Sequence, residues 1–288
     1  MKRTDIVMTD ELRAFLDFDL GHMNEEQYTN KIKDVVYFND LKLDIYYPDE
    51  EKEKYPVFVI LFGGGWISGF KEDKYVDLML KPLKYGFACV VPDYTLSLDA
   101  CFPQSVIDCK MAIDFVHKHA DEYKFDDSHI SVWGESAGGH LGLETGLVPN
   151  ELLGLEGIDT SIRDLIIFYP LTNIETADKN CPVDKPKQYR RDSVFGVYLG
   201  KNFDDPKMVR LSAPVHFVSE KMPALWLQHG LADTLVYPSQ SEELIKEVKK
   251  YPEVRFHHEL NEGLVHADDW YFSDENIRRI VEFVNEDR

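Results

Sequence analysis

The stretch that decides the fold reads Ile130-Ser131-Val132-Trp133-Gly134-Glu135-Ser136-Ala137-Gly138-Gly139-His140. A short apolar run stops at Gly134 and a helical start follows, which predicts a buried strand that turns sharply into a helix. Gly134 to Gly138 fit the pattern G-x-S-x-G, in which a serine on a strained turn points its hydroxyl into a cleft. Glycine is needed on both sides because the backbone passes close to itself there. A glycine-rich turn without chemistry also fits these five residues, so the rest of the chain has to decide.

Composition narrows the classes of partner. The chain has 288 residues, 44% hydrophobic content and a formal charge of −20. Such an acidic surface disfavours nucleic acid and anionic membranes as partners. We see neither an apolar leader at the N-terminus nor an apolar run long enough to span a bilayer. The cysteines show no C-x-x-C spacing, which predicts reduced thiols, no metal site and a cytoplasmic protein; they are Cys89, Cys101, Cys109 and Cys181.

The remaining chain repeats a strand-helix rhythm. Residues 35–38 and 41–47 flank a polar turn and predict an antiparallel hairpin. Apolar runs typical of buried strands follow at 57–62, 87–92, 130–134, 163–169 and 224–229, and a further strand is expected at 254–260. Helical patterns lie at 73–84, 103–120, 239–250 and 274–286. This order predicts a single α/β domain over 1–288, with a mostly parallel sheet and helices on both faces.

Two segments depart from that rhythm. Residues 1–30 look like an amphipathic helical extension, which covers the domain edge or supports a homodimer. Residues 171–221 hold scattered charges and the prolines Pro182, Pro186, Pro206 and Pro214. A long stretch of weak periodicity inside a compact domain favours a functional insertion, so we predict a small lid over the cleft. A surface loop, with residues 194–199 as an ordinary packed helix, is the alternative.

A run of glycines follows the strand at 57–62. Gly63-Gly64-Gly65-Trp66 lacks the Lys-Ser/Thr of a phosphate-binding loop and the spacing G-x-G-x-x-G. A loop that turns backbone N–H groups toward an oxyanion explains the glycines better, because bulky side chains would block access to it.

A serine nucleophile needs a base and an acid that orients the base. Asp233 and His266 each follow a predicted strand, and parallel strands bring such loops to one edge of the sheet. The order Ser136, Asp233, His266 therefore predicts a catalytic triad. Other candidates fit less well. His140 lies on the helix after Ser136, His229 sits at a strand end, His257 and His258 lie inside a strand, and Asp93 suits a loop hydrogen bond.

With these motifs in place, the chain resembles α/β-hydrolase carboxylesterases related to hormone-sensitive lipase and the bacterial acetyl/feruloyl esterase-like group. The resemblance rests on 62–69, Asp93-Tyr94, 134–140, 230–236 and 263–266, and it spans about residues 35–287. It implies a serine esterase with Ser136 as nucleophile, His266 as base and then acid, and Asp233 orienting His266. It further implies an oxyanion hole from the N–H groups of Gly64, Gly65 and Ala137, with no metal or organic cofactor.

The sequence departs from that family at two places. Phe62 stands where the family usually has a histidine that pins the glycine loop, and Thr95 stands where an arginine is usual. From position alone, we expect a substrate pocket lined by Trp66, Phe62, Tyr169 and Trp270. The leading hypothesis is a hydrolase of short-chain acyl esters, such as acetylated sugars or small aromatic esters. An arylformamidase-like amidohydrolase and a non-catalytic binding protein remain as alternatives.

Overall fold

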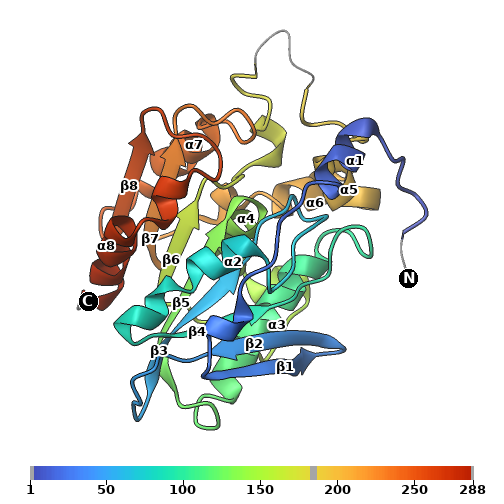
Figure 1. Ribbon diagram of the computed structural model, residues 1–288. Helices are drawn as coiled ribbons and strands as arrows, with labels where there is room; N and C mark the ends of the chain where they lie inside the picture. The colour runs from blue at the N-terminus through green and yellow to red at the C-terminus, as the bar shows by residue number, and fades with distance from the viewer. Residues whose placement is uncertain (1–2, 182–186, 287–288) are drawn as a thin grey trace.

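An eight-stranded sheet forms the centre of the computed structural model, which describes residues 3–181 and 187–286 (Figure 1). Its strand order is β1-β2-β4-β3-β5-β6-β7-β8. The strands are β1 (Lys31–Phe38), β2 (Leu41–Tyr46), β3 (Tyr55–Leu61), β4 (Ala88–Pro92), β5 (Phe125–Glu135), β6 (Asp164–Phe168), β7 (Ala224–Gly230) and β8 (Phe256–Asn261). Strand β2 pairs antiparallel with β1 and β4, whereas the pairs from β4 to β8 are parallel.

This architecture confirms the predicted α/β-hydrolase fold, including the N-terminal hairpin. Every residue of β4, β6 and β7 is buried, as expected for strands covered on both faces. The parallel strands share one carboxyl edge, and the loops after β3, β5, β7 and β8 therefore meet there.

Helices cover both faces of the sheet. They are α1 (Asp10–Leu16), α2 (Lys74–Met79), α3 (Gln104–Lys118), α4 (Ser136–Leu147), α5 (Val194–Leu199), α6 (Pro206–Leu211), α7 (Ser239–Val248) and α8 (Asp274–Asn285). Helices α3 and α4 contact each other on one face, whereas α2 and α8 lie on the other (Figure 1). The helix expected over 73–84 is divided, because α2 gives way to a 3-10 turn, Lys81–Tyr85, at Pro82, which lacks a backbone N–H.

The N-terminal extension is less helical than its pattern predicted. Only α1, capped by the Thr9 hydroxyl, and the turn Glu25–Gln27 are helical, and residues 1–2 lie outside the described part. Helix α1 lies beside α5 (Figure 1), where Leu12 packs with Ile67 and Val197. The extension therefore packs against the insertion at 171–221.

That insertion consists of short helices joined by loops. Its helix α5 buries most of its residues, which favours the packed-helix interpretation of 194–199. Pro182 and Pro186 lie outside the described residues. A lid function for 171–221 stays a prediction.

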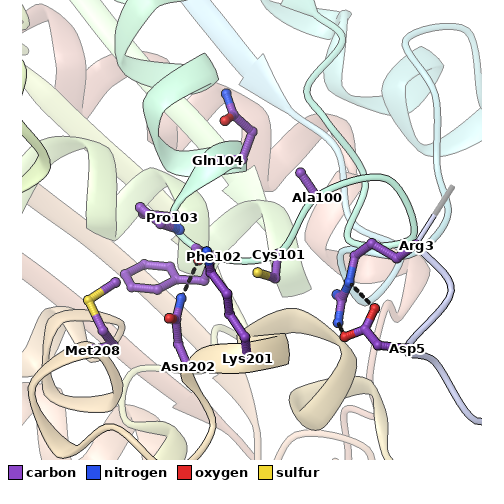
Figure 2. Close-up of a pocket in the computed structure, with 10 residues that line it drawn as sticks. All are labelled: Arg3, Asp5, Ala100, Cys101, Phe102, Pro103, Gln104, Lys201, Asn202 and Met208. Atoms are coloured by element: carbon purple, nitrogen blue, oxygen red, sulfur yellow. Dashed lines mark hydrogen bonds and ion pairs between the residues drawn. The ribbon is translucent and has the colours of Figure 1, made fainter. Parts of the chain in front are cut away.

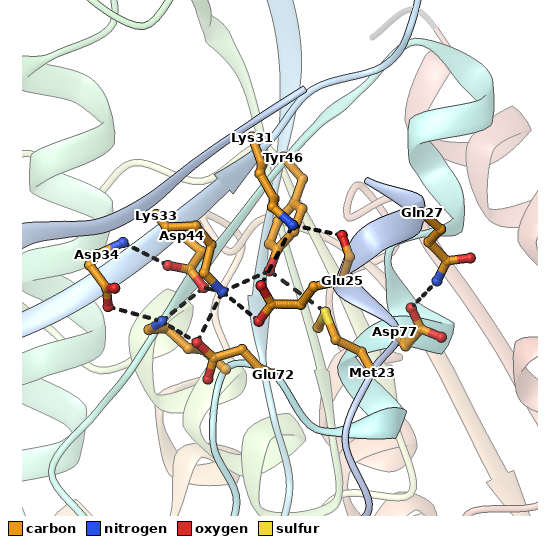
Figure 3. A network of polar contacts seen from close by, with 11 residues as sticks. Met23, Glu25, Gln27, Lys31, Lys33, Asp34, Asp44, Tyr46, Glu72 and Asp77 are labelled. Carbon is orange, nitrogen blue, oxygen red and sulfur yellow. Dashed lines mark hydrogen bonds and ion pairs between the residues drawn. The ribbon is translucent and has the colours of Figure 1, made fainter. Parts of the chain in front are cut away.

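A network of charges ties the hairpin to the segment before α2 (Figure 3). The carboxylate of Asp44 is fully buried and lies 2.6 Å from Lys33 Nζ and 2.9 Å from Lys71 Nζ. Glu72 contacts both lysines, at 3.0 Å and 2.5 Å. A buried carboxylate needs such paired cations, so the network fixes β2 against the chain that follows the glycine loop.

None of the described helices is both long and apolar enough to cross a membrane.

Candidate active site

Ser136 sits where β5 turns into α4. It is the first residue of the helix, and its φ of +53° is a left-handed conformation that non-glycine residues adopt rarely. A Cβ at Gly138 would collide with the carbonyls of Leu61 and Phe62, which explains the glycine there. The sharp turn leaves Ser136 partly exposed between buried neighbours, as the G-x-S-x-G pattern predicts.

The structure brings the three predicted triad residues together. His266, in the loop after β8, places Nε2 2.9 Å from Ser136 Oγ. Its other ring nitrogen, Nδ1, lies 2.7 Å from Asp233 Oδ2 in the loop after β7. Both distances suit hydrogen bonds, and the arrangement lets His266 accept the serine proton while Asp233 holds the ring.

Asp233 is fixed in its charged form. Burial by itself would raise its pKa, but hydrogen bonds from His229 and His266 outweigh burial and hold the pKa well below its usual range. The same carboxylate accepts hydrogen bonds from the backbone N–H groups of Leu235 and Val236. A charged Asp233 is suited to stabilise a protonated His266 ring.

The other histidines are engaged elsewhere. His229 Nε2 lies 3.2 Å from Asp233 Oδ2, and its Nδ1 lies 2.7 Å from the Ser241 hydroxyl, so it supports the acid. His140 is buried and contacts the Ser212 carbonyl at 3.0 Å. His257 stacks on Trp226, far along β8 from the loop.

Phe62, at the head of the glycine loop, is held by Tyr94. The two rings stack with centroids 4.3 Å apart, and the Tyr94 hydroxyl donates a 2.8 Å hydrogen bond to the Phe62 carbonyl. The Ser68 hydroxyl closes the other end by donating to the Gly64 carbonyl at 2.9 Å. These contacts hold the loop without the histidine that is usual at this position.

Two of the three residues predicted to supply oxyanion donors lie at the same cavity as the serine. Gly65 and Ala137 border the same cavity as Ser136. Among the described residues, the N–H groups of Gly64, Gly65 and Ala137 have no hydrogen-bond partner. Unpaired N–H groups at a loop and a helix start are available to a developing oxyanion.

A small cavity of about 120 Å³ opens at Ser136. Apolar side chains make up most of its wall. The lining residues are Glu11, Phe15, Gly65, Trp66, Ser136, Ala137, Leu171, Gln188, Val194, Phe195, Leu235 and Val236. Leu235 is 44% exposed and marks the mouth.

Of the four aromatic residues expected to line a pocket, the structure places only Trp66 at this cavity. Phe62 turns inward onto Tyr94 and is 1% exposed. Tyr169 is fully buried, and its ring packs against the His266 ring with centroids 4.6 Å apart. Trp270 packs on Tyr271 in the turn Asp269–Phe272.

Sequence reasoning missed the wall that the N-terminal extension supplies. Phe15 packs so closely on Gly65 that a Cβ there would lie 2.8 Å from its ring. Glu11 pairs with Arg190 of the insertion at 2.6 Å. Helical spacing placed Phe15 on the apolar face of the predicted helix, but no local sequence pattern shows which surface of the domain a terminal helix covers.

A larger hollow of about 620 Å³ lies elsewhere, between the N-terminus and the start of α3 (Figure 2). None of the three triad residues lines it. Its Arg3 guanidinium is already engaged by Asp5 and by the carbonyls of Ser97 and Val197. No cluster of metal-ligating side chains occurs in residues 3–181 and 187–286. The reactive groups therefore belong to the smaller cavity.

Comparison with known proteins identifies the family of this chain. The model of the BD-FAE family matches residues 43–248, which run from within β2 to the end of α7 and include two of the triad residues. The chain belongs to the BD-FAE family. Its fold is the α/β-hydrolase fold.

Curated relatives of this BD-FAE chain are named as esterases. Esterase LipQ of Mycobacterium tuberculosis is 26% identical over 65% of the chain and 44% of LipQ. The probable carboxylic ester hydrolase LipM of the same organism is 29% identical over 69% of the chain and 47% of LipM. The chain thus spans about half the length of the curated relatives it matches.

Solved structures share the fold over nearly the whole chain. A truncated carbohydrate esterase from gut microbiota superposes with a TM-score of 0.79, with 24% identity, over 91% of this chain and 98% of its own. Butyrate-bound Est2, an esterase of Thermogutta terrifontis, has a TM-score of 0.67 and 25% identity over 89% of this chain and 92% of its own.

Proposed function

We propose that this protein is a serine carboxylesterase that hydrolyses short-chain acyl esters through an acyl-enzyme intermediate. The observation that carries the proposal is the hydrogen-bonded series Ser136–His266–Asp233, with distances of 2.9 Å and 2.7 Å, whose serine lies at the wall of a small cavity. The esterase names of the relatives support the same reaction.

The reaction follows from the positions of these groups. Ser136 Oγ attacks the ester carbonyl as its proton passes to His266 Nε2, and the tetrahedral oxyanion accepts hydrogen bonds from Gly64, Gly65 and Ala137. His266 then gives that proton to the departing alcohol oxygen. Water, activated in turn by His266, attacks the acyl-serine and releases the acid, which restores the Ser136 hydroxyl.

Cavity size supports a small acyl group. A cavity of about 150 Å³ is known to hold benzene, so about 120 Å³ accommodates an acetyl to butyryl chain rather than an aromatic acid. The butyrate-bound structure of Est2 supports the same acyl range. Glu11 and Gln188 supply polar atoms to the cavity wall, where Glu11 pairs with Arg190 and the Gln188 amide donates to the Leu235 carbonyl. Their carboxylate and amide oxygens are acceptors for the hydroxyl groups of an alcohol such as a sugar.

Hydrolysis of p-nitrophenyl esters from C2 to C8 by the wild type and Ser136→Ala tests the proposal. We expect wild-type kcat/KM to fall steeply beyond C4, and Ser136→Ala to lose about 10⁴-fold or more in kcat. Equal rates for the two proteins would instead support a non-catalytic binding protein. Turnover of N-formylkynurenine but not of phenyl acetate would support an arylformamidase.

A further inference from the structure

Glu135 is a buried acid that the mechanism above does not use. It directly precedes Ser136 at the end of β5 and is only 6% exposed. A carboxyl group is costly to bury, so its place beside the nucleophile calls for a physical reason.

The carboxyl group of Glu135 lies against the glycine loop. A Cβ at Gly63 would collide with its Oε1 and lie 2.7 Å from its Cδ. The Gly63 backbone N–H faces this carboxyl and favours its charged form. The Tyr94 hydroxyl contacts the carbonyls of Phe62 and Gly63, at 2.8 Å and 3.4 Å. Both side chains thus contact Gly63, directly before Gly64 and Gly65.

We propose that Glu135 is a positioning residue that fixes the glycine loop against the serine turn through the Gly63 backbone. This role rests on the proposed esterase function. Glu135 acts through the loop and not on the substrate.

The role works best with a neutral carboxyl. Burial raises the pKa of Glu135 to about 8, and the nearby carboxylate of Asp73 adds to the rise. The phenols of Tyr75, Tyr94 and Tyr169 also face it. Within the described residues, no cation is among the groups that act on this carboxyl. Ionised Glu135 would oppose the negative charge that develops at the neighbouring oxyanion.

The test compares Glu135→Gln and Glu135→Ala with the wild type, by titrating phenyl acetate hydrolysis from pH 6 to 9.5 against a Ser136→Ala blank. If only protonated enzyme works, wild-type kcat falls about tenfold between pH 7 and pH 9. Glu135→Gln keeps kcat within about threefold at pH 7 and loses this alkaline fall. Glu135→Ala lowers kcat about tenfold with KM nearly unchanged, because a loosened loop weakens binding of the transition state and not of the substrate.

Glu144→Gln is the matched control. Glu144 is also buried, lies on α4, and accepts a 2.7 Å hydrogen bond from Tyr198, whose ring stacks on Trp66 at the far end of the glycine loop and not on Gly63. We expect it to keep the wild-type pH profile. An unchanged alkaline fall in Glu135→Gln overturns the positioning role, even if Glu135→Ala fails to fold. Wild-type enzyme without Ser136-dependent turnover overturns the proposed function, and this role with it.

Discussion

The hydroxyl of Tyr94 donates a 2.8 Å hydrogen bond to the carbonyl of Phe62, and the two rings stack with centroids 4.3 Å apart. Tyr94 follows β4 and Phe62 follows β3, so this pair joins two strand ends under the glycine loop. Phe62, which departs from the family pattern, is therefore held in place through its carbonyl oxygen and its ring. Loop position depends on Tyr94 as much as on the glycines.

Tyr94→Phe should loosen the glycine loop. The ring stack remains, but a buried carbonyl loses its donor, which costs about 1–3 kcal/mol of stability. We expect kcat on p-nitrophenyl acetate to fall several-fold together with the unfolding free energy in urea. Tyr37→Phe is the control, because its hydroxyl donates at 2.6 Å to the Asp93 carbonyl, outside the loop. If both variants kept wild-type kcat, Tyr94 would have no part in holding the loop.

Phe15→Ala should widen the acyl preference. Phe15 lines the cavity and packs on Gly65, so its removal opens room for added methylenes. Each methylene of the acyl chain that enters an apolar pocket stabilises the transition state by about 1–3 kcal/mol. We therefore expect the ratio of kcat/KM for the C8 ester to that for the C2 ester to rise at least about tenfold. Phe18→Ala serves as the matched control, since Phe18 is 58% exposed. An identical chain-length profile for Phe15→Ala and wild type would remove Phe15 from the substrate wall.

Asp44→Asn should destabilise the protein strongly. The fully buried Asp44 carboxylate pairs with Lys33 (Figure 3) and with Lys71. Lys71 is itself only 4% exposed. The substitution replaces the buried charged acceptor that both lysines share with a neutral amide and leaves Glu72 as their remaining common partner, at a cost of up to about 3–5 kcal/mol. Urea unfolding measures this loss. Asp121→Asn is the control, because it breaks an exposed pair with Lys54 and should leave the urea midpoint of unfolding unchanged. Equal urea midpoints for Asp44→Asn and Asp121→Asn would contradict a structural role for the network.

Stability should report the charge of Glu135 without any substrate. Its pKa is about 8 in the folded protein and near 4.5 when unfolded, so unfolding releases a proton between these values. Wild-type stability relative to Glu135→Gln is then highest below pH 4.5 and declines as pH rises to 8. Thermal unfolding of both proteins from pH 4.5 to 9 measures the difference. A constant difference across this range would mean that the folded pKa is not raised.

Local patterns in the sequence determined the strands, the serine turn and the order of the reactive residues. Residues Gly134 to Gly138 constrain the turn by backbone contact alone, and continuous apolar runs mark strands buried on both faces. Because parallel strands end at one edge, the chain order Ser136, Asp233, His266 was enough to predict that the three meet. The confirmed α/β-hydrolase fold follows from the same periodicities.

Only the tertiary structure decided what surrounds those residues. Phe15 reaches Gly65 across 50 positions of sequence, and Phe62 turns away from the cavity onto Tyr94. The contact of Phe15 and the orientation of Phe62 depend on which surfaces remain uncovered after the sheet forms. The spacing of residues in the sequence does not show which surfaces those are. The burial of Glu135 beside Gly63 likewise arises where two strand ends meet, so its raised pKa is a property of the fold and not of the chain.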